Sequence, residues 1–281
     1  MKYVFFGTPH IAEVTLQELK DKGILPDLII TAPARPQGRG LHMVETPVAI
    51  FAEINNIPFI APEKITAEVI EEIKNKGPWD FFFVVAYGKI LSTKLLEVVD
   101  GKVLNLHPSL LPLYRGPSPL ESVLLSDDKE TGVTIMQLDQ LVDHGPIVAQ
   151  TAFALDPNTT TNELTELCAK LGSALFANSI EKYLNKSITP TEQNHDSSTN
   201  TRKYIKADGL LTDDMSDWTK WKSFRAFGNR GWTHFITTKH GEPLQVKIIK
   251  ASYRDETFII EEVIPENGKR QPYADFLHSL N

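Results

Sequence analysis

The run DFFFVVAYG at residues 80–88 is the most apolar stretch of the chain, and it constrains the fold more than any other feature. A continuous apolar run of this length, bounded by turn residues, is typical of a strand buried on both faces, as in the centre of a parallel sheet. Shorter apolar runs at residues 2–6, 27–31 and 102–107 alternate with segments of helical periodicity. We therefore predict an α/β fold with a doubly wound, mostly parallel sheet covered by helices.

The remaining segments of the first 184 residues extend this pattern. Helical periodicity, in which apolar residues recur every three or four positions, is present at residues 10–23, 47–56 and 68–77, and a short strand pattern lies at 57–62. Two later strand-like runs, 132–138 and 146–153, are close enough in the chain to predict antiparallel pairing at a sheet edge. A long amphipathic helix is predicted over residues 161–184, and it closes the first domain.

We predict that a linker follows this helix. Residues 185–203 are polar and rich in Asn, Ser and Thr, which is typical of a connection between domains. The first domain is therefore predicted to span residues 1–184 and a smaller unit residues 204–281. In the smaller unit a helix at 216–227 precedes several short strand-like runs, a pattern typical of a small β-barrel similar to the OB fold.

Charge, cysteine content and hydropathy exclude several classes of protein. The chain has 29 Lys and Arg against 36 Asp and Glu, and a net charge of −7 argues against a general nucleic-acid-binding protein. Residues 201–281 hold 13 basic against 11 acidic side chains, so any nucleic-acid contact is expected to be local, in this part and one basic loop. The single cysteine, Cys168, cannot form a disulfide within the chain, which favours a reducing compartment. With neither an apolar run of about 18 residues nor a signal-peptide pattern, we expect a cytoplasmic protein.

Polar residues at the ends of the predicted strands indicate where a ligand would bind. The turn after the first strand contains only Gly7, so the glycine fingerprint of a nicotinamide-dinucleotide site is missing. Asn105 and His107 lie two residues apart at the carboxyl end of another strand, on the same face. An amide and an imidazole side by side can stabilise an oxyanion. On these two residues alone, a structural role in satisfying backbone groups is an equally good interpretation.

The loop between the two late strands carries Asp139 and Asp143. A carboxylate near His107 would favour the positively charged imidazole. Aspartates in loops usually form turns, and without a partner motif this structural role is the preferred interpretation of both residues.

Residues 33–40, PARPQGRG, form a basic loop after the second strand. Because the next helix begins near Pro47, we expect about fifteen residues without regular structure, and loops of that length in compact domains are usually functional or disordered. Arg35 and Arg39 could hold phosphates through charge-assisted hydrogen bonds. The alternative is a basic loop that is merely solvated.

Together these motifs resemble the folate-dependent formyltransferases. Asn105, His107 and Asp143 match the Asn-x-His and Asp pattern of that superfamily, and residues 105–121, NLHPSLLPLYRGPSPLE, are similar to its signature. Within the superfamily, the segments FGTP, RPQGRG, VAYGKIL and ETGVTIM are most similar to the enzymes that formylate the methionine of initiator methionyl-tRNA. RPQGRG is similar to their inserted loop, which approaches the acceptor end of the tRNA. The resemblance covers nearly the whole chain.

The resemblance implies 10-formyltetrahydrofolate as the formyl donor, initiator methionyl-tRNA as the acceptor, and no metal. Asn105 and protonated His107 would stabilise the oxyanion, and Asp143 would hold His107 and help to route the proton lost by the amine. Arg35, Arg39 and Arg115 are implied near the tRNA acceptor, although a structural ion pair is an equally good interpretation of Arg115. The residues implied in folate binding are Tyr87, Gly88, Lys89, Ile90, Leu91, Ser109, Leu110, Leu111, Pro112, Leu138 and Asp139.

We expect the protein to be a monomer. Three other functions remain as alternatives. A formyltransferase acting on a nucleotide-linked amino sugar and a formyltetrahydrofolate hydrolase would share the same motifs, but neither explains the basic loop at 33–40. A non-catalytic RNA-binding module would not need Asn105, His107 and Asp143. The negative net charge also disfavours strong non-specific binding of RNA.

Overall fold

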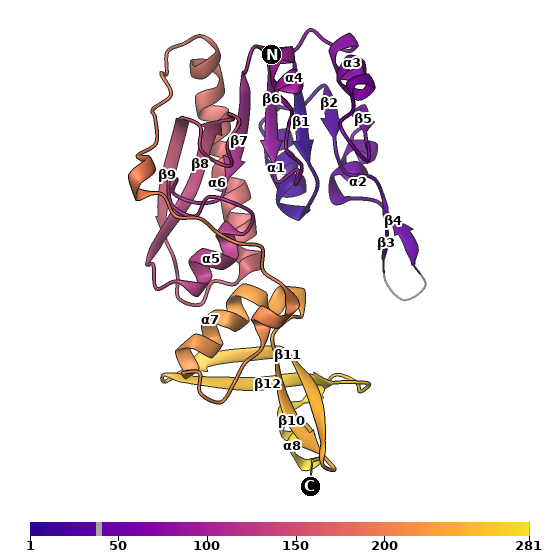
Figure 1. Ribbon diagram of the computed structural model, residues 1–281, viewed down its shortest axis with the longest axis vertical. Helices are drawn as coiled ribbons and strands as arrows, with labels where there is room; N and C mark the ends of the chain where they lie inside the picture. Colours follow the sequence, from indigo (N-terminus) through magenta and orange to yellow (C-terminus); the bar gives the residue numbers. More distant parts are fainter. Residues whose placement is uncertain (38–40, 281) are drawn as a thin grey trace. The chain divides into compact units, whose positions relative to one another are not determined.

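A computed structural model describes residues 1–37 and 41–280 of the chain. Its main feature is a seven-stranded sheet in the order β5-β2-β1-β6-β7-β8-β9 (Figure 1). Strands β5, β2, β1, β6 and β7 are parallel to one another, whereas β8 runs antiparallel to β7. The chain winds outward from β1 first to one side and then to the other. The predicted doubly wound, mostly parallel sheet is therefore confirmed.

The parallel strands and helices α1, α2 and α3 lie where periodicity predicted them, whereas the short helix α4 was not predicted. The strands are β1 (Tyr3–Gly7), β2 (Leu28–Ile30), β5 (Phe59–Ile60), β6 (Phe81–Val85) and β7 (Val103–His107), and the helices are α1 (His10–Asp21), α2 (Pro47–Ile54), α3 (Ala67–Asn75) and α4 (Thr93–Leu96). Helix α2 shows why its start was predictable. The Thr46 hydroxyl accepts a hydrogen bond from the Ala49 N–H at 3.0 Å, and Pro47 occupies the first turn, where its missing N–H costs nothing.

Strand β6 is buried on both faces, as its uniform apolarity predicts. Phe83 stacks on Phe176 of α6 (Thr161–Leu184), with ring centroids 3.9 Å apart. Phe82 points to the opposite face, into a cluster that includes Phe6 and Tyr87. Alternate residues of one strand thus supply the core on each side of the sheet.

The antiparallel edge of the sheet and the long helix also confirm predictions. Strands β8 (Glu130–Gln137) and β9 (Ile147–Ala154) extend the sheet beyond β7. Helix α6 packs against one face of β7. A Cβ built on Gly172 of the helix would lie only 2.3 Å from Leu106 Cδ1 of the strand. Glycine at this position therefore allows the helix to approach the strand closely.

The basic segment after β2 differs from the expectation of a loop without regular structure. Residues Arg35–Gln37 (β3) and His42–Val44 (β4) form an antiparallel hairpin, with Arg35 opposite Val44. Backbone pairing needs no apolar periodicity, so the composition of this segment did not reveal it. Arg39, in the connection between the two strands, lies outside the described residues.

The chain divides into two compact units whose boundaries differ from the predicted domains. The second unit combines Ser118–Thr131 and Ala154–Leu164 with the residues after Thr201. Within it, α5 (Pro119–Leu125) packs against α7 (Asp217–Phe227), and the Arg225 guanidinium donates a hydrogen bond to the Leu124 carbonyl at 3.1 Å. Ser118–Thr131 and Ala154–Leu164 therefore belong to the second unit, although the residues around them in the sequence belong to the first.

The remainder of the second unit is a four-stranded antiparallel sheet with a short helix, α8 (Tyr273–His278). Its strands are β10 (His234–Lys239), β11 (Glu242–Arg254), β12 (Thr257–Pro265) and β13 (Gln271–Pro272). Each strand pairs with its neighbour along the chain. Among the described residues β10 does not pair with β13, so the strands of the predicted small barrel form an antiparallel sheet.

Residues 191–200, which we call the strap, are not a free linker as predicted but part of the first unit. At one end, Thr191 and Ile147 exchange two backbone hydrogen bonds, each 2.8 Å long. At the other, the Arg115 N–H donates to the Thr199 carbonyl at 2.8 Å. A polar segment can pack firmly when its groups are hydrogen-bonded, which is why composition alone was misleading.

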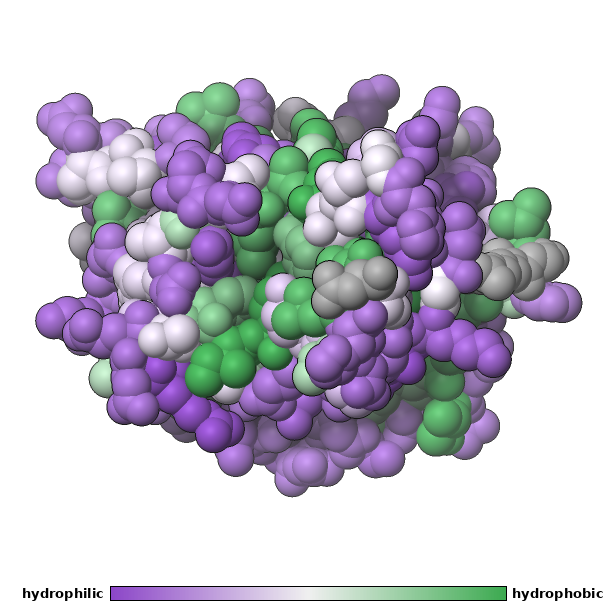
Figure 2. Space-filling view, turned by 90° about the horizontal axis from the view of Figure 1, so that it is seen from below, coloured by the Kyte–Doolittle hydropathy of each residue, from purple (hydrophilic) through white to green (hydrophobic). Residues whose placement is uncertain are grey.

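The surface drawn in Figure 2 is mainly hydrophilic, with smaller hydrophobic areas between the polar side chains. Across residues 1–37 and 41–280, no helix combines the length and the hydropathy that a membrane crossing requires.

Candidate active site

Strand β7 positions Asn105 and His107 on the face of the sheet opposite to α6. Leu106 contacts α6, so its two neighbours in the strand point the other way. Both side chains lie at the carboxyl end of the strand, as the sequence predicted, and both are buried. The register of β7 with β8 places His107 opposite Thr134 and Asn105 opposite Met136.

The Asn105 amide is available to a ligand. The residue is 8% exposed and lies at the end of the strand, beside His107 on the same face. Its amide N–H group can therefore donate to a substrate oxygen.

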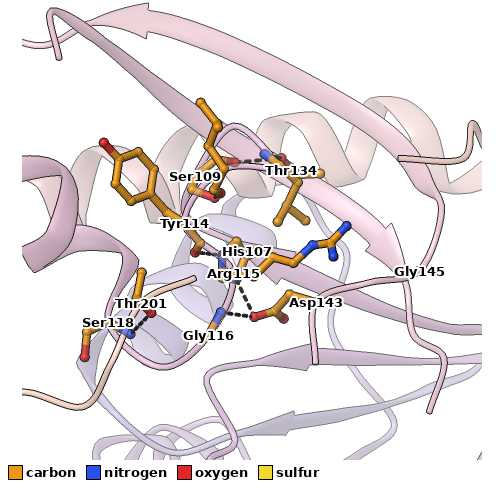
Figure 3. A network of polar contacts seen from close by, with 12 residues as sticks. His107, Ser109, Tyr114, Arg115, Gly116, Ser118, Thr134, Asp143, Gly145 and Thr201 are labelled. Carbon is orange, nitrogen blue, oxygen red and sulfur yellow. Dashed lines mark hydrogen bonds and ion pairs between the residues drawn. The ribbon is translucent and has the colours of Figure 1, made fainter. Parts of the chain in front are cut away.

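The His107 ring lies between two oxygen atoms from different loops (Figure 3). Its Nε2 is 2.9 Å from the carbonyl oxygen of Tyr114, and because a carbonyl only accepts, Nε2 carries a hydrogen and donates it. Its Nδ1 lies 3.5 Å from Asp143 Oδ2, an ion-pair distance rather than a direct hydrogen bond. A positively charged imidazole would satisfy both neighbours. Asp143 is far from Asn105 and His107 in the sequence, but the three side chains meet at one site.

Asp143 is held in an unusual backbone conformation. Its φ angle is +49°, in the left-handed region that residues with a Cβ rarely adopt. The carboxylate accepts a hydrogen bond from the Gly116 N–H at 2.7 Å, and the side chain is 12% exposed. The carboxylate is therefore oriented by the loop after β7 at the same time as it faces His107.

The segment 109–116 that follows β7 is a tightly bonded loop, which we call the signature loop. Ser109 is buried, and its hydroxyl donates to the Leu113 carbonyl at 2.7 Å. Thr134 on β8 donates to the Ser109 carbonyl at 2.6 Å and accepts from the Leu111 N–H at 3.3 Å. Leu110 packs beside Gly132, and the Leu111–Pro112 peptide is cis. The predicted folate-binding residues 109–112 therefore fix the shape of the loop through contacts within it and with β8.

The segment 87–91 after β6 combines a buried ring with an open turn. Tyr87 is buried, its hydroxyl has no partner among the described residues, and burial raises its pKa to about 12. Gly88 has a φ of +78°, and a Cβ there would meet nothing within 4 Å. Leu91 packs on the cluster around Tyr87, whereas Ile90 is 88% exposed.

Lys89 lies at the edge of a pocket of about 330 Å³. Its ammonium group donates to the carbonyls of Pro62 and Glu63 at 2.8 and 2.9 Å. Partial burial lowers the pKa of this lysine, opposed by the negative charge of Glu63. The pocket is lined by Glu63, Lys64, Ile65, Lys89, Ile90 and Ser92.

Residues 138–146, which we call the Asp143 loop, also contain Leu138 and Asp139. Leu138 packs against the same cluster as Tyr87, and its N–H donates to the Val103 carbonyl at 2.8 Å. Asp139 pairs with His144 at 2.7 Å and accepts from the Leu141 N–H. Asp139 therefore stabilises the loop from within.

The predicted acceptor arginines have different surroundings. Arg35 on the hairpin is exposed and pairs with Glu63 at 2.5 Å. Arg115 is buried, and its guanidinium donates to Gln193 Oε1 at 2.7 Å and contacts His195 Nδ1 at 2.9 Å. It is thus engaged inside the first unit, with a glutamine and a histidine as partners rather than a carboxylate.

Three contributors to the site were not predicted from the sequence: the Tyr114 carbonyl, the Gly116 N–H and the Gln193 side chain. The first two are backbone groups, whose positions depend on loop conformation rather than on residue type. Gln193 lies in a polar segment that gave no sign of burial. Within the described part of the chain, no three His, Cys, Asp or Glu side chains are grouped as a metal ion would need.

Comparison with known proteins identifies the family of this site. Residues 1–180 match the formyl transferase family. A methionyl-tRNA formyltransferase of Chloroflexus aurantiacus is 32% identical over 272 residues, which cover 97% of this chain and 87% of the relative. The chain belongs to the methionyl-tRNA formyltransferase family. A further member from Thermotoga sp. (strain RQ2) is 37% identical over 232 residues, covering 82% and 74% of the two chains.

Solved structures show the formyltransferase fold as well. A methionyl-tRNA formyltransferase from Clostridium thermocellum superimposes with a TM-score of 0.64 at 16% identity, covering 94% of this chain and 99% of that one. A sugar 3N-formyl transferase, determined in the presence of dTDP and 5-N-formyl-THF, gives a TM-score of 0.67 at 24% identity, with coverage of 91% and 87%. At these identities the structures show the shared fold alone.

Proposed function

We propose that this protein transfers a formyl group from 10-formyltetrahydrofolate to the amino group of methionine on initiator methionyl-tRNA. The names of relatives at 32–38% identity support this acceptor. The single observation that carries the proposed chemistry is the meeting of Asn105, His107 and Asp143, with the carboxylate 3.5 Å from the imidazole.

Asn105 and His107 are proposed to stabilise the negative charge that develops on the formyl oxygen. The amine of the acceptor attacks the electrophilic carbon of the 10-formyl group. The bond between that carbon and N10 of the folate then breaks, and tetrahydrofolate leaves as N10 takes up a proton. The Asn105 amide can donate to the oxygen, and one well-placed donor of this kind commonly lowers a barrier by about 3–4 kcal/mol. His107 adds positive charge next to it, with its ring held by the Tyr114 carbonyl.

Asp143 is proposed to orient His107 and to accept, directly or through a water, the proton that the amine loses. Its carboxylate is fixed by the Gly116 N–H and faces the ring of His107. A base must lie within hydrogen-bond reach of the proton it takes, and the 3.5 Å contact is expected to shorten once substrates bind.

The segment 87–91 and the loops that face it are proposed to bind the folate. The open space at Gly88 allows the backbone to contact a flat ring, and the unpaired Tyr87 hydroxyl offers a buried polar group. The signature loop and the Asp143 loop, with Ser109, Leu110, Leu111, Pro112, Leu138 and Asp139, supply the remaining walls in this proposal.

The hairpin β3–β4 is proposed to contact the tRNA acceptor end through Arg35 and Arg39. Arg35 is exposed on the hairpin, and its pairing with Glu63 involves only one surface carboxylate. Phosphate contacts by arginine position a nucleic acid without reading its sequence. The buried Arg115 fits a structural role better than a direct acceptor contact.

An assay with a labelled formyl donor tests the proposal and its alternatives. The purified protein is incubated with charged initiator tRNA, with a nucleotide-linked amino sugar, or with no amine. Transfer to methionyl-tRNA alone is the expected result. Transfer only to the amino sugar, or release of formate without an amine, would instead support the sugar enzyme or the hydrolase.

We also propose that the protein acts as a monomer in the cytoplasm, where charged tRNA is available. Light scattering after size-exclusion chromatography tests the monomer, and cell fractionation tests the location. A dimer mass or a membrane fraction would contradict the respective statement.

A further inference from the structure

The Asp143 loop needs support because its key residue has a strained backbone. Asp143 has a φ of +49°, and a left-handed conformation costs a residue with a Cβ roughly 1–2 kcal/mol. Such conformations persist only where surrounding contacts define them. The side chain of Asp143 has Gly116 and His107 as neighbours, but these contacts do not hold its own backbone.

Gln193 of the strap holds that backbone from the other side. Its Nε2 donates to the Asp143 carbonyl at 2.9 Å and to the Gly145 carbonyl at 2.7 Å. Gln193 is buried, whereas most residues of the strap are exposed. Both hydrogens of one amide are therefore used on the two carbonyls that flank His144.

The other end of the same amide is bound to the signature loop. Gln193 Oε1 accepts from Arg115 Nη2 at 2.7 Å and from Arg115 Nε at 3.2 Å. Arg115 lies between Tyr114, whose carbonyl holds His107, and Gly116, whose N–H holds Asp143. One side chain thus connects the loop that carries the carboxylate with the loop that orients both members of the His107–Asp143 pair.

Further contacts keep the strap itself in place. Thr199 accepts from the Tyr114 N–H through its hydroxyl at 2.8 Å, in addition to its backbone bond with Arg115. His195 stacks on His144, with ring centroids 4.0 Å apart and planes within 2°. Gly145 fits tightly, because a Cβ there would lie 2.1 Å from the Gln137 carbonyl oxygen. The carbonyls that Gln193 binds therefore have little room to shift.

We propose that Gln193 is a positioning residue of the catalytic centre, which sets the distance between the Asp143 carboxylate and the His107 imidazole by fixing the backbone of the Asp143 loop. This inference rests on the proposed function for its kinetic consequence. Gln193 contacts neither the reacting atoms nor, in this arrangement, the side chains of His107 and Asp143. Its effect is expected in the rate of the chemical step rather than in substrate affinity.

Gln193→Glu is the most direct test, with Asn194→Asp as a matched control. The first variant keeps the size of the side chain but replaces the donor that holds the Asp143 and Gly145 carbonyls by an oxygen. The second makes the same amide-to-carboxylate change on the adjacent residue, which is exposed. We expect kcat of Gln193→Glu to fall about 10- to 100-fold, because misplacement by about 1 Å has effects of that size. KM for both substrates should change less than about threefold, and Asn194→Asp should stay within about twofold of wild type.

Hydrogen–deuterium exchange provides a second measurement that needs no substrate. Peptides covering residues 138–146 should exchange about tenfold faster in Gln193→Glu than in the wild-type and Asn194→Asp proteins. Gln193→Asn, which is too short to reach both carbonyls, replaces Gln193→Glu if the latter does not fold.

The outcomes separate this inference from the proposed function. If the wild-type protein does not formylate methionyl-tRNA, the proposed function fails. The role of Gln193 is then tested by the hydrogen–deuterium exchange of residues 138–146 and by kcat with the amine that the wild-type protein does formylate. An unchanged kcat in a folded variant, an unchanged exchange rate, or a raised KM with unchanged kcat would overturn the positioning role.

Discussion

Replacing Asp143 by asparagine isolates the charge of the carboxylate from its shape. Asparagine tolerates the left-handed backbone, and its side-chain oxygen can still accept from the Gly116 N–H. The fold should therefore survive. What is lost is the attraction between the carboxylate and a positively charged His107.

The structure sets the size of that loss. Two unit charges 3.5 Å apart attract each other by about 5 kcal/mol at an effective dielectric constant of about 20, which is typical near a protein surface. The side chain of Asp143 is 12% exposed, so water weakens the interaction somewhat. Because about 1.4 kcal/mol corresponds to a tenfold change in rate, we expect kcat to fall about 10²- to 10³-fold.

The assay is the initial rate of formyl transfer from labelled donor to charged initiator tRNA, with KM measured for both substrates. Asp100→Asn is the matched control, because Asp100 is also left-handed (φ +52°) and lies 3.9 Å from a cation, Lys102, but is 88% exposed. It should retain wild-type kcat within about twofold. If Asp143→Asn retains kcat within about threefold while melting at the wild-type temperature, the charge of Asp143 does not act on the chemical step.

Four further predictions address other parts of the site. Asn105→Ala should lower kcat about 10²- to 10³-fold with little change in melting temperature, and a normal kcat would remove Asn105 from the oxyanion site. Tyr87→Phe removes a buried hydroxyl without a partner, so the free protein should gain about 1 kcal/mol in urea unfolding while KM for the folate donor rises; a lower stability would show that the hydroxyl is already paired. Gly145→Ala should lower both melting temperature and kcat, because its Cβ would lie 2.1 Å from the Gln137 carbonyl oxygen, whereas Gly23→Ala, with nothing within 4 Å, should leave kcat unchanged. Arg39→Ala should raise KM for tRNA and leave KM for the folate donor unchanged, and an equal loss for both substrates would contradict a role confined to the acceptor.

The core of the fold could be predicted because burial leaves a direct trace in the sequence. Phe81–Val85 is apolar at every position because helices cover both faces of the strand, and α6 lies at Thr161–Leu184, where its periodicity predicted it. The hairpin β3–β4 and the strap left no such trace. Their order comes from backbone and side-chain hydrogen bonds, which polar residues in many arrangements could form.

The candidate site shows the same division. The spacing of Asn105 and His107 on a strand determined that both would share one face, because side chains alternate along a strand. The resemblance to the formyltransferases added Asp143. Neither source indicated that Arg115 would be buried, since arginine is usually exposed and its burial here depends on Gln193 and His195 from a distant segment.

Local sequence thus determined which segments became buried strands and helices, and which two side chains would leave β7 together. The tertiary structure alone decided how close the Asp143 carboxylate lies to the imidazole, because that distance depends on a strained backbone held by Gln193 some fifty residues further along the chain. Short-range periodicity encodes burial, but contacts between polar loops depend on the path of the whole chain, and these contacts give the three side chains their common geometry.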